Sequence, residues 1–206
     1  SQHDAEQRSL FFPSLFDSSV VIVNYAKNGR STGSFIREGL WDSVFSRLGK
    51  DDYLIIQFGH NDEKKEKGDR YTPPDAYRAN LVKFVNGARA KGALPILCTP
   101  IVRRRFDSTG TFYDEHGVYP GIVREVADLL KVPLLDMHRS SWKLVEGLGA
   151  EESKKIYLWV PAGRYKSLPD GKEDNTHFGE YGATRMAQLA ASALREIDHP
   201  LARHLK

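Results

Sequence analysis

The fold of this chain is decided by the stretch Tyr53-Leu54-Ile55-Ile56-Gln57-Phe58-Gly59-His60-Asn61-Asp62. Its first six residues form a short apolar run, and such a run bounded by polar residues is typical of a buried β-strand. The run ends at Gly59, where a polar loop begins. We therefore interpret this stretch as a strand whose carboxyl end opens directly into a loop rich in hydrogen-bonding groups.

Three more apolar runs have the length of strands, and we expect strands over residues 19–23, 94–101 and 132–137. Segments with apolar residues every three to four positions, as in an amphipathic helix, separate these runs. We expect helices over residues 32–48, 75–90, 122–130, 140–148, 152–158 and 180–197. Strands that alternate with helices of this length indicate a parallel sheet joined by right-handed crossovers. The sequence therefore predicts one doubly wound α/β domain spanning residues 1–206.

The composition of the chain excludes several classes of protein. With 206 residues, of which 40% are hydrophobic, the chain can bury a sizeable core. A net charge of +3 is only mildly basic, which does not indicate nucleic-acid binding but tolerates an acidic substrate. The single Cys98 excludes an internal disulfide and a cysteine-based zinc site, and its apolar surroundings predict a buried side chain. No segment approaches the roughly 20 apolar residues of a membrane span, and no signal-peptide pattern is present.

Polar loops follow two of the predicted strands, at residues 24–31 and 59–62. Because ligand sites of open parallel sheets lie beyond the carboxyl ends of the strands, we expect both loops on one rim. The backbone N–H of Gly29 is not obstructed by a side chain, and Asn61 carries a side-chain NH2 group. Two such donors would stabilise an oxyanion during acyl transfer by roughly 3–4 kcal/mol each. The alternative is that Gly29 only allows a turn with positive φ, while Asn61 and Asp62 cap the segment that follows.

A second candidate pair lies in a polar loop before the last predicted helix, in Asp174-Asn175-Thr176-His177-Phe178. At this spacing Asp174 can accept the Nδ1 proton of His177, fix its tautomer and leave Nε2 to act as a general base. The alternative is that Asp174 caps the helix and His177 is an ordinary polar residue. The tetrapeptide alone does not decide between them.

Together these loops resemble signature blocks of the SGNH (GDSL-type) hydrolases. Three blocks are recognised, as Asn24-x-Ala26-x-x-Gly29-Arg30-Ser31, Gln57-Phe58-Gly59-His60-Asn61-Asp62 and Asp174-Asn175-Thr176-His177-Phe178. The resemblance is closest to the rhamnogalacturonan acetylesterase branch, which is also similar in the run Thr99-Pro100-Ile101-Val102-Arg103-Arg104-Arg105-Phe106. The blocks follow one another in the family's order.

The resemblance implies a flavodoxin-like, three-layer α/β/α sandwich and serine-esterase chemistry. In such enzymes a serine attacks an acetyl carbonyl. Carried over residue by residue, His177 is the base and Asp174 its orienter, while Gly29 and Asn61 are donors of the oxyanion hole. The implied substrates are acetylated pectic polysaccharides or oligosaccharides rich in galacturonic acid, which suggests an extracellular or periplasmic location. No metal or organic cofactor and no membrane partner is implied, and the oligomeric state stays open.

One departure from the family concerns its first block, a Gly-Asp-Ser at the end of the first strand, which this sequence does not contain. In the family this strand is central to the sheet, and its loss would leave backbone groups without partners. Three explanations stay open: the chain is a fragment, the neighbouring strands have closed up, or another chain supplies the strand. We favour an N-terminally incomplete chain, because the polar start through Arg8 is similar to the loop that follows the nucleophile.

The nucleophile is therefore unassigned. Ser1 is a candidate, either as the nucleophile cut from its strand or as a residue just beyond it. We expect the chain as it stands to be a poor esterase. Two other functions stay open, namely a non-catalytic homologue that binds sugar polymer, which the missing block favours, and another SGNH ester hydrolase such as a lipase or a methylesterase. The Lys, Arg and Asp residues of the loops favour a polar substrate over a lipid.

Other side chains near the blocks are candidates for binding substrate. We expect His60 either to contact substrate or to hold its own loop. Arg103, like the two arginines that follow it, is predicted to pair with galacturonate carboxylates, which a planar guanidinium contacts in bidentate fashion. The alternative is a solvated or salt-bridged loop. Three tryptophans are candidates for a sugar platform, although the first has the spacing of a packed helix residue: Trp41, Trp142 and Trp159.

Overall fold

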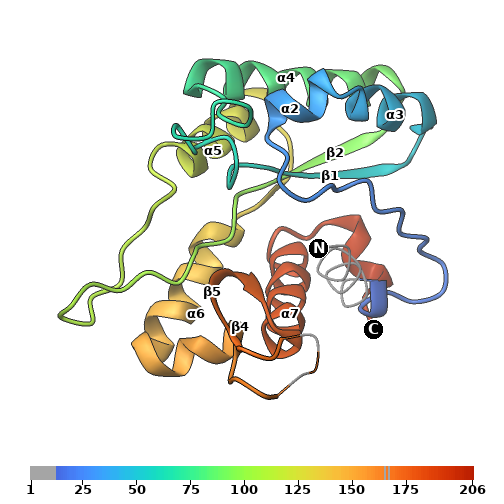
Figure 1. The fold of residues 1–206 in the computed structure, drawn as a ribbon. Coiled ribbons are helices and arrows are strands. Elements are labelled where there is room, and N and C mark those ends of the chain that lie inside the picture. The colour runs from blue at the N-terminus through green and yellow to red at the C-terminus, as the bar shows by residue number, and fades with distance from the viewer. Residues whose placement is uncertain (1–12, 165, 167) are drawn as a thin grey trace. The chain divides into compact units, whose positions relative to one another are not determined.

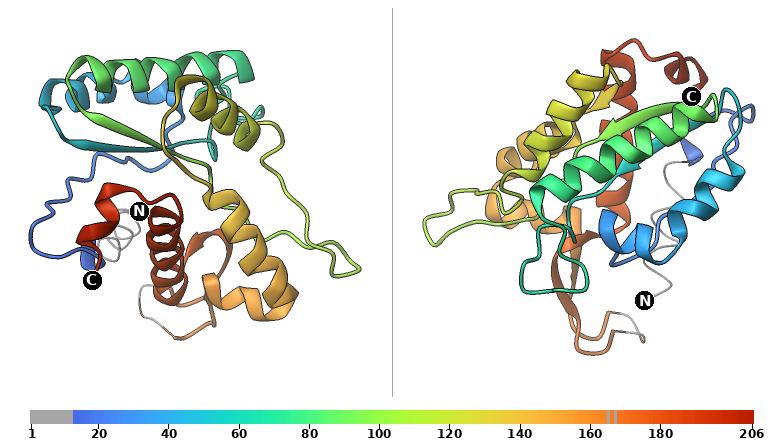
Figure 2. Two further views of the ribbon diagram at one scale, coloured as in Figure 1. Left: turned by 180° about the vertical axis from the view of Figure 1, so that it is seen from behind. Right: turned by 90° about the horizontal axis from the view of Figure 1, so that it is seen from above.

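The computed structural model describes residues 13–164, 166 and 168–206. These residues form two compact units. The first, which we call the sheet unit, comprises residues 23–100 and 116–138. The second, which we call the hairpin unit, comprises the described residues of 13–22, 101–115 and 139–206. Figure 1 labels their helices and strands, and Figure 2 shows the same elements from behind and from above.

Three parallel strands form the sheet of the sheet unit, in the order β1 (Tyr53–Gln57), β2 (Leu94–Cys98) and β3 (Leu134–Leu135). The last residues of the first two strands, Gln57 and Cys98, are partners, so the loops that follow begin at the same edge. The predicted parallel sheet is confirmed, but all three strands are shorter than predicted, β1 by the single residue Phe58. β2 stops at Cys98, two residues before Pro100. β3 has two residues because α6 begins at Met137.

Four helices belong to the sheet unit: α2 (Thr32–Arg37), α3 (Leu40–Arg47), α4 (Pro74–Ala90) and α5 (Tyr119–Leu130). The last two confirm the helices predicted there; they pack against each other and both contact β2 (Figure 1). The single helix predicted over residues 32–48 is wrong, since two helices form instead. Gly39 separates them at φ 69°, a left-handed conformation that glycine adopts without a steric penalty.

Aromatic side chains fill the core of the sheet unit. The rings of Trp41 and Phe84 lie 4.7 Å apart, and Phe35 packs edge-on against Phe58 at 5.3 Å. Gly87 allows the indole to approach α4, because a Cβ there would lie 2.7 Å from Trp41 Cζ2. Trp41 is buried, so it packs in the core and does not form a sugar platform.

The strand predicted over residues 19–23 is wrong, because residues 20–27 form neither strand nor helix. Val21 and Val23 are 85% and 62% exposed. A run of β-branched residues favours a strand only where a neighbouring strand satisfies its backbone groups. In the part of the chain that the structure describes, β1 is an edge strand and no strand pairs with this run. The chain turns instead at Asp17, whose carboxylate accepts the backbone N–H of Ser19 at 2.8 Å.

The hairpin unit contains most of α6 (Met137–Glu152), then η1 (Ser153–Ile156), β4 (Tyr157–Val160), β5 (Lys172–Phe178), α7 (Glu180–Glu196) and η2 (Pro200–His204). The helix predicted over residues 140–148 lies within α6, which is interrupted at Gly149, and the last predicted helix is confirmed by α7. The helix predicted over residues 152–158 is wrong, because only the short 3-10 helix η1 forms there and the chain continues as strand β4 from Tyr157. Its end is aromatic and β-branched, which suits the antiparallel pairing of β4 with β5.

The polar loop predicted around Asp174 is also wrong, because this segment is part of strand β5. Its polar side chains conceal the strand from a search for apolar runs. Among the helices of the described residues, none has both the length and the apolar character needed to cross a membrane.

Candidate active site

The aspartate–histidine pair lies at an irregularity of the β4–β5 hairpin. Leu158 pairs with Asp174, whereas its neighbour Tyr157 pairs with Phe178, so one step along β4 spans four residues of β5. Residues 175–177 therefore protrude from the ladder, and we call them the β5 bulge. Bulges are common beside active sites, where they change the direction in which a side chain points.

The structure brings Asp174 and His177 into direct contact. The Nδ1 atom of His177 lies 2.6 Å from Oδ2 of Asp174. The other carboxylate oxygen accepts the backbone N–H groups of Thr176 at 2.8 Å and His177 at 2.9 Å. The imidazole is 39% exposed, so it is accessible to a reactant. A proton on Nδ1 leaves the lone pair of Nε2 available to a general base.

The charge of Asp174 suits this arrangement. Burial by itself would raise its pKa, but the backbone N–H groups of His177 and Thr176 and the His177 ring lower the pKa of Asp174 to about 2. Lys172 Nζ lies 3.6 Å from Asp174 Oδ2 and adds a positive charge nearby. The carboxylate is therefore ionised at neutral pH and can stabilise the imidazolium that forms when His177 takes up a proton.

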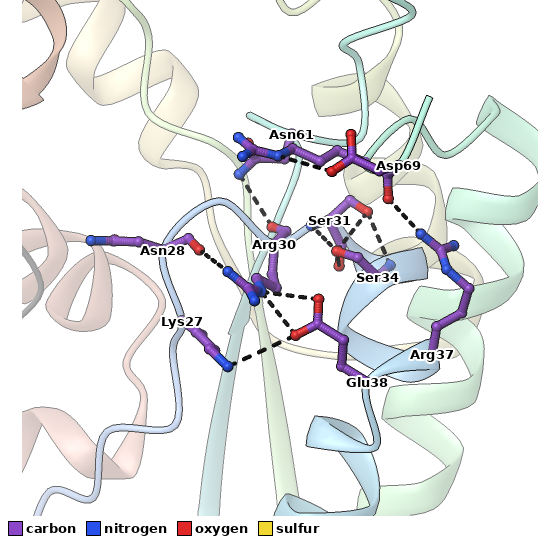
Figure 3. Close-up of polar contacts among 10 residues, drawn as sticks. Lys27, Asn28, Arg30, Ser31, Ser34, Arg37, Glu38, Asn61 and Asp69 are labelled. Carbon is purple, nitrogen blue, oxygen red and sulfur yellow. Dashed lines mark hydrogen bonds and ion pairs between the residues drawn. The ribbon is translucent and has the colours of Figure 1, made fainter. Parts of the chain in front are cut away.

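The loop that contains Gly29 is anchored within the sheet unit. Gly29 adopts φ 75°, a left-handed conformation, as the turn interpretation requires. Arg30 donates to the carbonyl of Asn28 and to the carboxylate of Glu38, each at 3.0 Å (Figure 3). Ser31 forms a capping box with Ser34 at the start of α2 (Figure 3). The loop thus connects a segment without regular secondary structure, residues 20–27, to the capped helix α2.

Asn61 connects this loop to the one that follows β1. Its Nδ2 donates to the backbone carbonyl of Arg30 at 3.2 Å (Figure 3). A primary amide carries two N–H donors, so the second can serve an oxyanion. The structure therefore joins the Gly29 and Asn61 loops, whereas their roles as oxyanion donors stay predictions.

Asp62 organises the same loops, a role that we did not predict from the sequence. Its carboxylate accepts the backbone N–H of Thr32 at 2.8 Å, the hydroxyl of Thr32 at 2.6 Å and the N–H of Gly59 at 3.2 Å. Burial raises the pKa of Asp62 to about 6, although these hydrogen bonds act in the opposite direction. Asp62 thus caps the start of α2 and not the segment that follows it.

The three consecutive arginines have different environments. Arg103 is 6% exposed, and Arg105 Nε lies 2.8 Å from the Glu115 carboxylate. Arg104 donates from its backbone N–H and its guanidinium to Asn175, in the β5 bulge. Binding of galacturonate by Arg103 stays a prediction, and its burial means that a substrate must reach a largely covered group.

His60 packs against a buried pair at the carboxyl end of β1. Its ring contacts His116 edge-on at 4.7 Å, and His116 Nδ1 lies 2.6 Å from the carboxylate of Glu63. Both members of this pair are at least nine-tenths buried. His60 thus contributes to holding its loop, one of the two predicted roles, while its contact with substrate stays a prediction.

Other predicted residues are placed as follows. Ser1, the candidate nucleophile, lies outside the described residues. Cys98 is buried as predicted, and burial raises the pKa of its thiol to about 12. Trp142 packs edge-on against Phe112 at 4.9 Å. Trp159 Nε1 donates to Asn175 at 2.9 Å, and the platform role of both tryptophans stays a prediction.

Residues 4–185 match the GDSL-like lipase/acylhydrolase family. The chain is 40% identical over 194 residues to the rhamnogalacturonan acetylesterase RhgT of Bacillus subtilis, covering 94% of this chain and 82% of the relative. It is 33% identical over 192 residues to YesY of the same organism, a probable rhamnogalacturonan acetylesterase, covering 93% of this chain and 84% of the relative.

Solved structures share the fold. The Bacillus subtilis protein YxiM superimposes with a TM-score of 0.77 at 21% identity over 94% of this chain, which spans about half (51%) of that structure. A catalytic mutant of Axe2, an acetylxylan esterase from Geobacillus stearothermophilus, superimposes with a TM-score of 0.64 at 18% identity, covering 98% of this chain and 82% of that one. The predicted fold class, a three-layer α/β/α sandwich on a parallel sheet, is confirmed by this likeness.

Proposed function

The chain belongs to the GDSL-like lipase/acylhydrolase family, and from this premise we propose that it is a carbohydrate O-acetyl esterase acting on rhamnogalacturonan-type pectic polysaccharide. The observation that carries the proposal is the hydrogen-bonded Asp174–His177 pair, which has the geometry of an oriented general base. The substrate class is supported by the two relatives named as rhamnogalacturonan acetylesterases, one of them 40% identical to this chain.

In the proposed mechanism, His177 transfers protons in both halves of an acyl transfer. Nε2 takes the proton of a serine hydroxyl as its oxygen bonds to the acetyl carbonyl carbon. The imidazolium, stabilised by Asp174, then protonates the sugar oxygen as the ester C–O bond breaks and the deacetylated sugar leaves. Water attacks the acetyl-serine with the same assistance from His177, and acetate and the free serine are produced.

Gly29 and Asn61 are proposed to stabilise the negative charge on the carbonyl oxygen in each tetrahedral intermediate. The support is that Asn61 is hydrogen-bonded to the loop of Gly29 through the carbonyl of Arg30, and that this loop leads into the capped helix α2. Removal of one such donor typically costs about 3–4 kcal/mol of transition-state stabilisation.

Cationic side chains around Gly29 support a polar, acidic substrate over a lipid. A Cβ placed on Gly29 would lie 3.3 Å from Nη1 of Arg70, so this guanidinium lies directly beside the glycine. Arg70 is 37% exposed and Lys27 is 53% exposed. Arg70 lies 3.7 Å from the Asp69 carboxylate, and Lys27 lies 3.9 Å from that of Glu38. Carboxylates of a galacturonate-rich polymer would compete for these partly exposed cations. The size of such a polymer also leads us to propose a location outside the cytoplasm.

We propose further that the chain acts as one domain and that its nucleophile is the serine of an upstream Gly-Asp-Ser block, which residues 1–206 do not contain. The test compares the chain as it stands with an extended chain, in which an added strand ends in Gly-Asp-Ser. Acetate release from acetylated rhamnogalacturonan should be strong only in the extended chain and should be lost in its His177→Ala variant. Equal acetate release with and without the imidazole would reject the proposal. Polymer binding without acetate release in either form would identify a non-catalytic homologue.

A further inference from the structure

We propose that Arg104 is a positioning residue that acts through Asn175, together with Trp159, to hold the β5 bulge and so orient His177. This inference rests on the proposed role of His177 as the general base. It assigns a function to an arginine that the sequence pattern suggested as a substrate contact. Arg104 acts through Asn175, to which it donates from its guanidinium and from its backbone N–H.

The β5 bulge needs support from outside the ladder. Its three residues are passed over in the pairing of β4 with β5, so strand pairing does not determine their conformation. The Asp174 carboxylate stabilises the bulge from within by accepting the N–H groups of Thr176 and His177. The same carboxylate orients the imidazole, and a shift of the bulge would therefore disturb both functions together.

Asn175 is the point at which the rest of the hairpin unit holds the bulge. Its side-chain oxygen accepts the indole N–H of Trp159 at 2.9 Å and the guanidinium N–H of Arg104 at 3.0 Å. Its backbone carbonyl accepts the backbone N–H of Arg104 at 2.9 Å. An amide oxygen has two acceptor sites, and both are used here. Asn175 is thus fixed at its side chain and at its backbone.

Arg104 is itself held on several sides. Its Nε donates to the carbonyl of Ala150 and to the hydroxyl of Ser153, each at 3.1 Å. The guanidinium carbon lies 5.0 Å from the ring centre of Trp159 and 5.6 Å from that of Phe106. Only a planar group with several fixed donors can make these contacts at once, so lysine cannot replace this arginine.

His177 lies in a strand, and the contacts of Arg104 supply the support that a helix would otherwise give to a catalytic side chain. Arg104 connects the end of α6, through Ala150, and the start of η1, through Ser153, to the residue two positions before His177. Misplacing a catalytic group by about 1 Å can reduce turnover about 100-fold. A connection of this kind is therefore expected to affect kcat more than substrate affinity.

The test uses two conservative variants and one matched control. Arg104→Lys keeps the charge but removes the forked contacts, and Trp159→Phe keeps a ring but removes the indole donor. Arg89→Lys is the control. Arg89 lies near the end of α4 in the sheet unit, and its guanidinium also donates to a backbone carbonyl, that of Leu130 at the end of α5, at 2.7 Å. All three should lose some thermal stability, so stability alone does not separate the hypotheses.

Two measurements separate positioning from a merely structural role. Long-range 1H–15N NMR spectra of the chain as it stands report the tautomer of neutral His177, which should be the Nδ1–H form in wild type and Arg89→Lys. In Arg104→Lys and Trp159→Phe the two tautomers should mix. In the acetylesterase assay, carried out with the extended chain, kcat should fall about 10- to 100-fold in these two variants while KM changes little.

The outcomes distinguish this inference from the proposed function. An unchanged His177 tautomer in both Arg104→Lys and Trp159→Phe would overturn the positioning role, whatever the activity. Tautomer mixing in these variants alone would support it even if no form of the chain released acetate, in which case only the proposed function would fail. A rise in KM with unchanged kcat would instead identify Arg104 as a substrate contact and would also overturn the inference.

Discussion

Gly182 should be intolerant of any side chain, because α7 passes unusually close to η1 at this residue. A Cβ on Gly182 would lie 1.7 Å from the carbonyl oxygen of Ile156, against the 3.4–4 Å of an ordinary contact. In the Gly182→Ala variant the start of α7 must therefore move. Overpacking of this kind costs about 1–3 kcal/mol. The movement also endangers the hydrogen bond from the Gly179 N–H to the same carbonyl, which contributes about 1 kcal/mol.

The higher helix propensity of alanine offsets about 0.5–1 kcal/mol of this cost, which leaves a net loss of about 1–3 kcal/mol. For a chain of this size, a loss of about 2 kcal/mol lowers Tm by roughly 4–8 °C. Gly147→Ala is the matched control, since Gly147 is an exposed residue of α6 with no atom within 4 Å of its Cβ position. It should raise stability by about 0.5–1 kcal/mol.

The assay is thermal unfolding followed by circular dichroism, with wild type and both variants in one buffer. The expected result is a shift of opposite sign for the two substitutions. A Gly182→Ala variant as stable as Gly147→Ala would refute the close approach of α7 to Ile156.

Three further predictions concern charged groups. Asp174→Asn should lower kcat of the extended chain about 1,000- to 10,000-fold without a comparable rise in KM. The reason is that an amide can donate to Nδ1 and so favours the Nε2–H tautomer of His177, which cannot act as a base through Nε2. A loss of less than about tenfold in acetate release would count against the oriented base. The pKa of Asp62 is raised from 3.8 to about 6, so its contribution of roughly 3 kcal/mol is fully present below pH 3.8 and is lost as pH rises through 6. Denaturant unfolding should therefore show wild type losing stability relative to Asp62→Asn between these pH values, and a constant difference would be inconsistent with the raised pKa. Arg103→Ala should raise KM for the polymer while hydrolysis of p-nitrophenyl acetate is kept. Because Arg103 is 6% exposed, the substitution should also lower Tm. Equal losses of activity on both esters would argue against substrate binding by Arg103.

Much of the fold was predictable because each element carried its own signal. Residues 53–56 are apolar and the strand leads into a polar loop, while α4 begins at a proline and presents one apolar face, so local pattern and tertiary structure agree. The failures occurred where a partner decides the outcome. Val21 and Val23 have strand propensity, but no described strand pairs with them. The polar β5 became a strand because β4 pairs with it.

The candidate site was predictable to the extent that its chemistry is written in short motifs. Asp174 and His177 are three residues apart, and their contact follows from that spacing. The supporting residues were not predictable in this way. Asp62 acts on Thr32, which is 30 residues away in sequence, and Arg104 acts on Asn175 across 71 residues. One signal in the sequence could have indicated them. Asn175 lies inside the Asp174–Phe178 motif, and a partly buried amide at that position needs hydrogen-bond partners from elsewhere in the chain.

The central claim is that His177 activates a serine, and labelling with a fluorophosphonate tests it most directly. The extended chain and its His177→Ala variant are treated with the reagent, and the modified peptide is identified by mass spectrometry. One serine, that of the Gly-Asp-Ser block, should be modified, and its rate of modification should fall at least about 100-fold without the imidazole. Modification of that serine at the same rate in both proteins would contradict the account.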